Sequence, residues 1–154
     1  MAARDIYAEI DRPEHRARQL AVHLSFFEIY GGRCQDLLHG RAKVTIREDG
    51  NGRVNRVGLG AVKCGDENAL LSEIERGNEA RTTHATAINS VSSRSHAICD
   101  IVVKDGAGRM WGKLSLIDLA GSERAADTRS HNRQRRLESA EINKSLLALK
   151  ECIR

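Results

Sequence analysis

Two short polar segments hold the side chains of this sequence that are best suited to phosphate and metal chemistry. Residues Asn89–His96 read Asn-Ser-Val-Ser-Ser-Arg-Ser-His, and residues Asp118–Glu123 read Asp-Leu-Ala-Gly-Ser-Glu. A serine hydroxyl is a hard oxygen ligand that suits Mg²⁺, and a carboxylate can hold the same ion through water. A glycine lets a backbone N–H approach a phosphate oxygen without a Cβ in the way. Together the segments predict paired sensors of the terminal phosphate of a nucleotide.

Each segment also has a structural interpretation without chemistry. A cluster of serines usually forms a solvated loop, and Asp118 can simply cap the end of a strand. The alternating stretch Lys113–Ile117 predicts that strand, which places Asp118 at its carboxyl end. Open α/β sheets bind ligands outside the carboxyl ends of their strands, so the position of Asp118 favours the metal role.

The remaining elements read as one α/β domain. Apolar residues recur at helical spacing in three stretches. In the stretch that follows Asp66 these residues are Leu70, Leu71 and Ile74, and Asp66 can cap the first turn. Strand patterns separated by Asp-Gly turns predict two hairpins. The expected helices are Ala2–Ile10, the helix that follows Asp66, and Arg133–Ile153; the expected strands are Ala21–Tyr30, Val44–Ile46, Val54–Val57, Ala97–Val103 and Lys113–Ile117.

Composition excludes several classes of protein. The 154 residues are 40% hydrophobic and 30% charged, which is typical of a folded soluble domain and not of a disordered chain. The net charge of +4 favours an acidic partner. The four cysteines form no C-x-x-C pair, so we expect reduced thiols rather than a disulfide frame or a zinc site. No apolar stretch approaches membrane-spanning length.

The sequence lacks a phosphate-binding P-loop. That loop needs the pattern G-x-x-x-x-G-K-[ST], in which backbone N–H groups and a lysine hold the phosphates. The nearest stretch, Gly108–Lys113, has the wrong spacing, and Leu114 stands where a hydroxyl is required. A nucleotide site built from this chain alone would therefore be incomplete.

Four stretches in a fixed order resemble the kinesin motor domain. Asn89–His96 and Asp118–Glu123 are similar to its switch I and switch II. Ser25–Tyr30, together with Asp36-Leu-Leu38, resembles a strand-and-turn signature of the family, and Glu141–Leu149 resembles the helix that follows switch II. The resemblance runs from Ala2 to Arg154. It implies a three-layer α/β fold, part of the kinesin-type P-loop NTPase fold, with a mixed central sheet flanked by helices. Residues 1–154 would form the central part of the motor, without the P-loop and the C-terminal part.

The resemblance also implies roles around ATP and Mg²⁺. Asn89 and Ser92 would lie near the terminal phosphate and the attacking water, while Ser92 and Ser93 would contact the γ-phosphate. Ser93 and Asp118 would hold Mg²⁺, and Gly121 would donate its N–H to the γ-phosphate.

Arg94 and Glu123 are the two residues whose expected role in the mechanism is most specific. As two solvated charges they would contribute at most about 1 kcal/mol. The functional interpretation is a latch that closes switch I onto switch II only when γ-phosphate is present, which orders two loops and positions water for hydrolysis.

The basic residues before the last helix suggest a partner surface. Nucleic acid is conceivable, but no aromatic residues are interleaved to stack on bases, so we expect no nucleic-acid binding. In the kinesin family this region faces tubulin, and Asn143 would couple the helix to the switch loop. Lys150-Glu-Cys152 resembles the tubulin-facing motif of the internal-motor, microtubule-depolymerising class, kinesin-thirteen. The tubulin-facing candidates are Arg129, Arg133, Arg135, Arg136, Lys144, Lys150, Glu151 and Cys152, with Lys43, Arg47 and Arg53 as a second, weaker group.

The resulting hypothesis is a fragment of a microtubule-stimulated ATPase, inactive by itself, whose intact protein removes tubulin from microtubule ends. The alternatives are a non-catalytic microtubule-binding module and, more remotely, a basic nucleic-acid-binding domain. The resemblance implies a cytoplasmic location on microtubules, for example in a spindle or flagellum. It allows homodimerisation through regions outside this chain, and it implies no membrane partner.

One expectation concerns the sheet edge. In the family, the strand Lys113–Asp118 pairs with the strand that feeds the P-loop. Without that neighbour it would be a bare apolar edge, which is a template for aggregation. We therefore expect the isolated chain to be poorly soluble or to self-associate.

Overall fold

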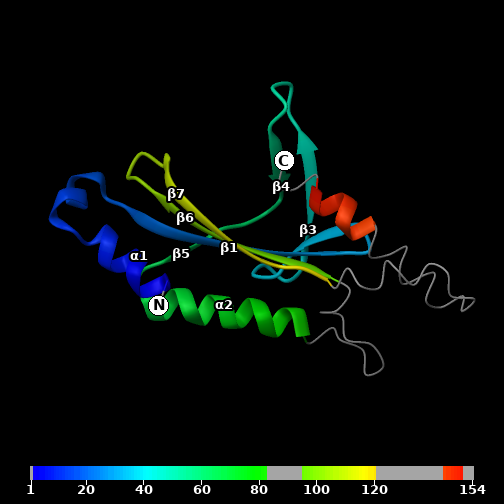
Figure 1. The fold of residues 1–154 in the computed structure, drawn as a ribbon, viewed down its shortest axis with the longest axis horizontal. Helices are drawn as coiled ribbons and strands as arrows, with labels where there is room; N and C mark the ends of the chain where they lie inside the picture. Colours follow the sequence, from blue (N-terminus) through cyan, green and yellow to red (C-terminus); the bar gives the residue numbers. More distant parts are fainter. Residues whose placement is uncertain (1, 83–94, 121–143, 151–154) are drawn as a thin grey trace, which may run out of the picture.

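A computed structural model describes residues 2–82, 95–120 and 144–150 of the chain. Its centre is a twisted seven-stranded sheet in the order β4-β3-β2-β1-β6-β7, with β5 also pairing with β1 (Figure 1). All strand pairs between described residues are antiparallel. The strands are β1 (Ala21–Tyr30), β2 (Arg33–Asp36), β3 (Ala42–Glu48), β4 (Val54–Val57), β5 (Val62–Cys64), β6 (His96–Lys104) and β7 (Met110–Asp118).

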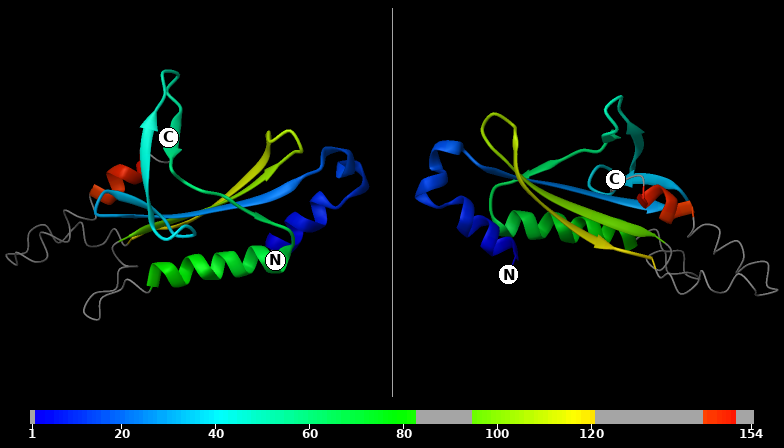
Figure 2. Two further views of the ribbon diagram at one scale, coloured as in Figure 1. Left: turned by 180° about the vertical axis from the view of Figure 1, so that it is seen from behind. Right: turned by 45° about the horizontal axis from the view of Figure 1, so that its top comes forward.

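Two α-helices lie along the same side of the sheet (Figures 1 and 2). Helix α1 (Ala2–Ile10) leads into a short 3₁₀ helix, η1 (Pro13–Arg18), and helix α2 spans Glu67–Thr82. The first turn of α2 is capped as predicted, since the Asp66 carboxylate accepts the backbone N–H of Ala69 at 2.8 Å. Residues 144–150 are also helical.

Side-chain alternation along β1 divides the core into two layers. Val22, Leu24 and Phe26 are buried on the face covered by α1 and α2. Phe27 and Ile29 face the opposite side, where Leu149 of the helical stretch 144–150 packs against them. A strand that is apolar at both alternations is thus covered on both faces, which confirms the predicted α/β fold with flanking helices.

Helix α2 can approach the sheet closely because position 77 is glycine. A Cβ at this position would lie 2.2 Å from Cδ1 of Phe26, far inside van der Waals contact. Gly77 and Asn78 both have a lower helix propensity than alanine or leucine. The helix nevertheless continues to Thr82 and carries Arg81 towards the start of β6 and the end of β7.

Both predicted hairpins are present, and an aspartate organises each turn. The Asp49 carboxylate accepts the backbone N–H groups of Asn51 and Arg53 between β3 and β4. Asp105 does the same for Ala107 and Arg109 between β6 and β7. These hydrogen bonds to the charged form are the main cause of the lowered pKa of both carboxyl groups.

Two short strands, β2 and β5, were missed by the sequence patterns. Both are at most four residues long and are recruited by pairing with β1, so no periodicity of their own reveals them. Of the predicted helix Arg133–Ile153, only residues 144–150 are described, and these are helical. The remainder of that prediction lies outside the described residues.

Strand β7 is the last strand of the sheet path among the described residues. Its apolar side chains are exposed on both faces: Leu114 and Leu116 pair with the β6 positions whose side chains join the α1–α2 core, while Ile117 faces the other side. This agrees with the expected apolar edge at Lys113–Asp118. None of the helices in the described part of the chain has the length and apolarity needed to cross a membrane.

Candidate nucleotide-sensing site

The pairing of β6 with β7 brings the two polar segments together. Ala97 lies opposite Asp118 in the ladder, so the first segment ends where the second begins. The backbone N–H of Ala120 donates to Nδ1 of His96 at 3.1 Å, which joins the segments beyond the last ladder pair. The described residues of the two segments therefore share one end of the sheet.

Only part of each segment is described. Ser95 and His96 are fully buried at the start of β6, and Asp118 and Ala120 mark the end of β7. The predicted site residues that lie outside the described part of the chain are Asn89, Ser92, Ser93, Arg94, Gly121 and Glu123.

His96 has a defined protonation state. Burial lowers its pKa, the nearby Arg81 charge lowers it further, and the Asp118 carboxylate partly opposes both effects. Because Nδ1 accepts the Ala120 N–H, the ring proton of the neutral imidazole is on Nε2. Nε2 is buried and has no hydrogen-bond partner among the described residues. His96 is thus a neutral imidazole that links the two segments through its acceptor nitrogen.

Arg81 is the second link, and sequence reasoning missed it. Its side chain is 8% exposed, and Nη1 lies 2.6 Å from Oδ2 of Asp118. Nη2 donates to the backbone oxygen of Ser95 at 3.0 Å, and Nε and Nη2 each lie 3.3 Å from the Ser95 hydroxyl oxygen. The sequence signal was only an arginine in the last turn of a helix, where a solvated position is the usual interpretation.

Behind Arg81 lies an almost fully buried carboxylate, Glu28 of β1. Its Oε2 accepts a hydrogen bond from Nη2 of Arg41 at 2.5 Å, and its Oε1 lies 3.8 Å from Nε of Arg81. Glu28 belongs to the stretch Ser25–Tyr30 that resembles the kinesin signature, but the sequence gave no reason to connect it with the two polar segments. Its burial between two guanidinium groups provides that reason.

Asp118 has the properties needed to hold a cation through water. Its carboxylate is 69% exposed although Arg81 contacts Oδ2, so solvent reaches the group. Hard carboxylate oxygens fit Mg²⁺, which keeps several of its waters. The second predicted Mg²⁺ ligand, Ser93, lies outside the described residues.

The predicted tubulin-facing residues fall into two described groups. Lys43, Arg47 and Arg53 are exposed on the β3–β4 hairpin, and Lys144 and Lys150 are exposed on the helical stretch. Lys43 and Lys144 line one cleft of about 1020 Å³, so the hairpin and the helical stretch are neighbours. The other candidates lie outside the described residues: Arg129, Arg133, Arg135, Arg136, Asn143, Glu151 and Cys152.

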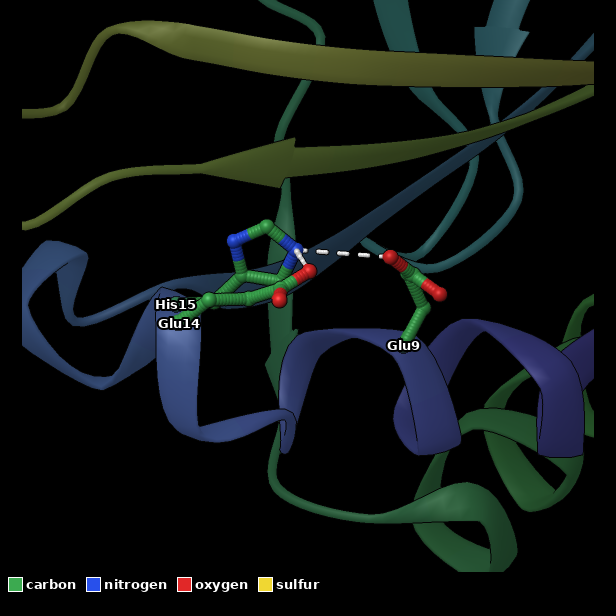
Figure 3. Close-up of side chains that lie close together, drawn as sticks. All are labelled: Glu9, Glu14 and His15. Atoms are coloured by element: carbon green, nitrogen blue, oxygen red, sulfur yellow. Dashed lines mark hydrogen bonds and ion pairs between the residues drawn. The ribbon is translucent and has the colours of Figure 1, made fainter.

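A separate cluster of potential metal ligands lies at the junction of α1 and η1 (Figure 3). The carboxylates of Glu9 and Glu14 lie 3.3 and 3.8 Å from Nε2 of His15. Arg12 already pairs with both acids, at 3.2 and 3.9 Å, and three of these four side chains are more than half exposed. The cluster is explained as a surface ion network, and it is remote in the fold from the start of β6 and the end of β7 (Figure 1).

Comparison with known proteins identifies the family of this chain. The family model of the kinesin motor domain matches residues 1–154. Diatom spindle kinesin-1 of Cylindrotheca fusiformis is 52% identical over 152 residues, covering 99% of this chain and 24% of that protein. The human kinesin-like protein KIF24 is 49% identical over 154 residues, covering the whole chain and 11% of that protein. The chain thus spans a quarter or less of the length of these relatives.

Solved structures show the same similarity. A KIF14 motor dimer bound to a microtubule with AMP-PNP has a TM-score of 0.68 and 30% identity, over 96% of this chain and 44% of that chain. The structure of a fast kinesin has a TM-score of 0.72 and 31% identity, over 97% of this chain and 44% of that one. With the whole chain matched by the family model, this protein belongs to the kinesin motor domain family.

Proposed function

We propose that this chain is the central part of a kinesin motor that couples ATP hydrolysis to microtubule binding. The observation that carries the proposal is the meeting of two chemically suited segments at one end of the sheet. His96 and Ala120 are hydrogen-bonded there, and Arg81 contacts both Ser95 and Asp118. A loop that starts at each of these points can close over the same phosphate group.

The proposed roles at the nucleotide are those that the resemblance to the kinesin family implies. Ser93 and Asp118 hold Mg²⁺, and the Gly121 N–H and the Ser92 and Ser93 hydroxyls contact the γ-phosphate. Asn89 and Ser92 orient the attacking water. Magnesium supplies charge neutralisation at the phosphates when it is bound. Because the sequence has no P-loop, we expect no ATPase activity from the 154-residue chain alone.

The Arg94–Glu123 latch can be tested by mutation in the full-length protein. Glu123→Ala should abolish ATP hydrolysis while largely sparing nucleotide binding, because the latch orders the loops only after the nucleotide is bound. Steady-state phosphate release and binding of a fluorescent nucleotide measure the two effects separately. Glu75→Ala, at an exposed position of α2, is the matched control and should retain activity. Unchanged turnover in Glu123→Ala would refute the latch.

We propose tubulin as the partner of the basic surfaces. The exposed cations of the β3–β4 hairpin and of the helical stretch fit an acidic surface. The KIF14 motor, a structural relative, is bound to a microtubule in its solved structure. We propose a cytoplasmic, cytoskeletal location, and we propose neither nucleic acid nor a membrane as a partner. Any homodimer would form through regions outside this chain.

Depolymerisation is the finer proposal, and it depends on Lys150-Glu-Cys152. Replacing these three residues with alanine in the full-length protein should reduce tubulin release from stabilised microtubules while leaving basal ATPase activity unchanged. Tubulin release is measured by sedimentation of the polymer. Wild-type protein that moves along microtubules without shortening them would assign the chain to a transport motor instead.

A non-catalytic microtubule-binding module is the second candidate. The absence of a P-loop in this sequence favours it, whereas the presence of both sensor segments favours the ATPase. The two candidates differ in one measurement, since a full-length protein that binds microtubules but no nucleotide is a module.

A further inference from the structure

Four ionised side chains of alternating sign form a continuous chain from the β2–β3 turn to the end of β7. Arg41 Nη2 lies 2.5 Å from Glu28 Oε2, Glu28 Oε1 lies 3.8 Å from Arg81 Nε, and Arg81 Nη1 lies 2.6 Å from Asp118 Oδ2. We propose that this ion chain sets the positions from which both nucleotide-sensing loops start, with Arg41 and Arg81 as positioning residues. The inference about the nucleotide site rests on the function proposed above.

Arg81 is placed where three elements converge. It comes from the last turn of α2, and its guanidinium contacts the backbone and hydroxyl of Ser95 at the start of β6 and the carboxylate of Asp118 at the end of β7. A planar guanidinium with donors in a rigid fork fixes the separation of its acceptors, which a lysine ammonium cannot do. One side chain therefore determines where the first segment ends relative to where the second begins.

Arg41 forms the other end of the ion chain, and its own backbone has an unusual conformation. Its φ of 59° lies in the left-handed region, which residues other than glycine seldom occupy. All three guanidinium nitrogens are engaged: Nε and Nη2 donate to Gln35 Oε1, Nη2 also donates to Glu28, and Nη1 donates to the backbone oxygen of Ala80 at 3.0 Å. Ala80 directly precedes Arg81, so Arg41 secures both the acid and the helix end that position Arg81.

Stability alone does not account for such an arrangement. Burying ion pairs costs desolvation that their attraction barely offsets, and apolar residues of similar volume are often equally stable. Glu28 is 1% exposed, and its Oε1 accepts no hydrogen bond from the described residues, although the Arg81 charge faces it. A buried charge network of this kind is best explained by the geometry it specifies, which here is the meeting point of the two segments.

Amide exchange in the full-length protein, followed at the Ala120 N–H, tests the positioning role without requiring catalysis. The Ala120 N–H reports the distance between the segments, because it donates to His96. Arg81→Gln should accelerate its exchange at least about tenfold, which corresponds to about 1.4 kcal/mol. Arg81→Lys keeps the charge but not the fork, and it should also accelerate exchange. Arg76→Lys is the matched control on the same helix, where the arginine pairs with the partly exposed Glu73, and it should leave Ala120 unchanged.

Arg41→Gly provides a second test that separates side chain from backbone. Glycine relieves the left-handed φ, so any acceleration of Ala120 exchange arises from the lost guanidinium. Unchanged exchange in both Arg81→Lys and Arg41→Gly would overturn the inference. If Arg81→Gln does not fold, Arg81→Lys decides the result.

Activity of the full-length protein separates this inference from the proposed function. Arg81→Lys should lower the rate of ATP hydrolysis without an equal loss of nucleotide affinity, and Arg76→Lys should not. A wild-type protein without ATPase activity would refute the proposed function, yet the Ala120 exchange data would still decide whether the ion chain positions the two segments.

Discussion

At the scale of single residues, burial determines which polar groups can titrate. His96 is neutral inside the protein because its protonated form would be desolvated and would face the Arg81 charge. Cys99 shows the same effect for an anion, since burial first and the neighbouring Asp100 second raise the pKa of its thiol to about 12. Both residues lie on β6, the strand that carries the end of the first polar segment into the core.

The His96 environment predicts a pH dependence of stability. Its pKa is lowered in the folded state relative to 6.5, so the unfolded chain binds more protons as the pH falls. The free energy of unfolding should therefore decrease below pH 6.5, by at most about 1.4 kcal/mol per pH unit for this one group. His96→Asn, which keeps an acceptor for Ala120, should reduce this slope in urea titrations at several pH values.

His23 provides the control for that experiment. Its pKa is also lowered, by burial first and then by Lys104 and Lys63, so it contributes a slope of the same sign. His23→Asn should remove the contribution of His23 to the slope of stability against pH and leave the contribution of His96. An unchanged slope in His96→Asn would contradict the assignment of a neutral, buried imidazole.

The raised pKa of Cys99 predicts slow chemistry at this thiol. In a variant whose other three cysteines are serine, Cys99 should react with a maleimide at pH 8 only as fast as the protein unfolds, because a buried thiol supplies almost no thiolate. Mass spectrometry follows the labelling, and denaturant provides the positive control. Rapid labelling of the folded protein would contradict the buried position.

At the scale of elements, the contact between α2 and β1 decides where Arg81 lies. Gly77 allows the helix to approach Phe26, and the end of the helix then reaches β6 and β7 one turn later. Helix propensity alone would disfavour glycine here by about 1 kcal/mol relative to alanine. The close approach therefore outweighs propensity at this position.

Gly77→Ala should consequently destabilise the protein, although alanine is the better helix former. Its Cβ would lie 2.2 Å from the Phe26 ring, and such overpacking typically costs about 1–3 kcal/mol. Chemical denaturation measures the loss. Gly65→Ala is the control, because nothing lies within 4 Å of a Cβ there. A gain in stability for Gly77→Ala would show that the helix can move away from the sheet at little cost.

At the scale of the whole molecule, the β7 edge determines the expected self-association of the isolated chain. Among the described residues no strand pairs with the outer side of β7, and apolar side chains are exposed on both of its faces, among them Trp111 at 49%, Leu116 at 47% and Ile117 at 45%. Long apolar edges of this type pair with other chains unless they are covered.

The isolated chain should therefore self-associate through β7. Sedimentation velocity should show a weight-average mass that rises with concentration, and Leu116→Glu should shift it towards the monomer. Leu71→Glu replaces a similarly exposed leucine on α2 and should have no effect. A sharp monomer boundary that is independent of concentration would contradict the proposed edge pairing.

Local patterns determined much of this protein without its tertiary structure. The apolar pattern of Ala21–Tyr30 predicted a strand, and Asp66 predicted the start of α2, because side-chain period and capping act over a few residues. The residue types and order of the two polar segments predicted the family. The strand Lys113–Ile117 also predicted where Asp118 lies, since a strand carries its last residue to the edge of a sheet.

Only the tertiary structure revealed the residues that join those segments. Arg41, Glu28 and Arg81 are far apart in sequence, and each by itself is consistent with an ordinary surface charge. Their burial and pairing depend on the close packing of α2 against β1 and on the antiparallel register of β6 and β7. A buried charge needs its partner at a particular distance in space, and no local sequence pattern encodes that distance.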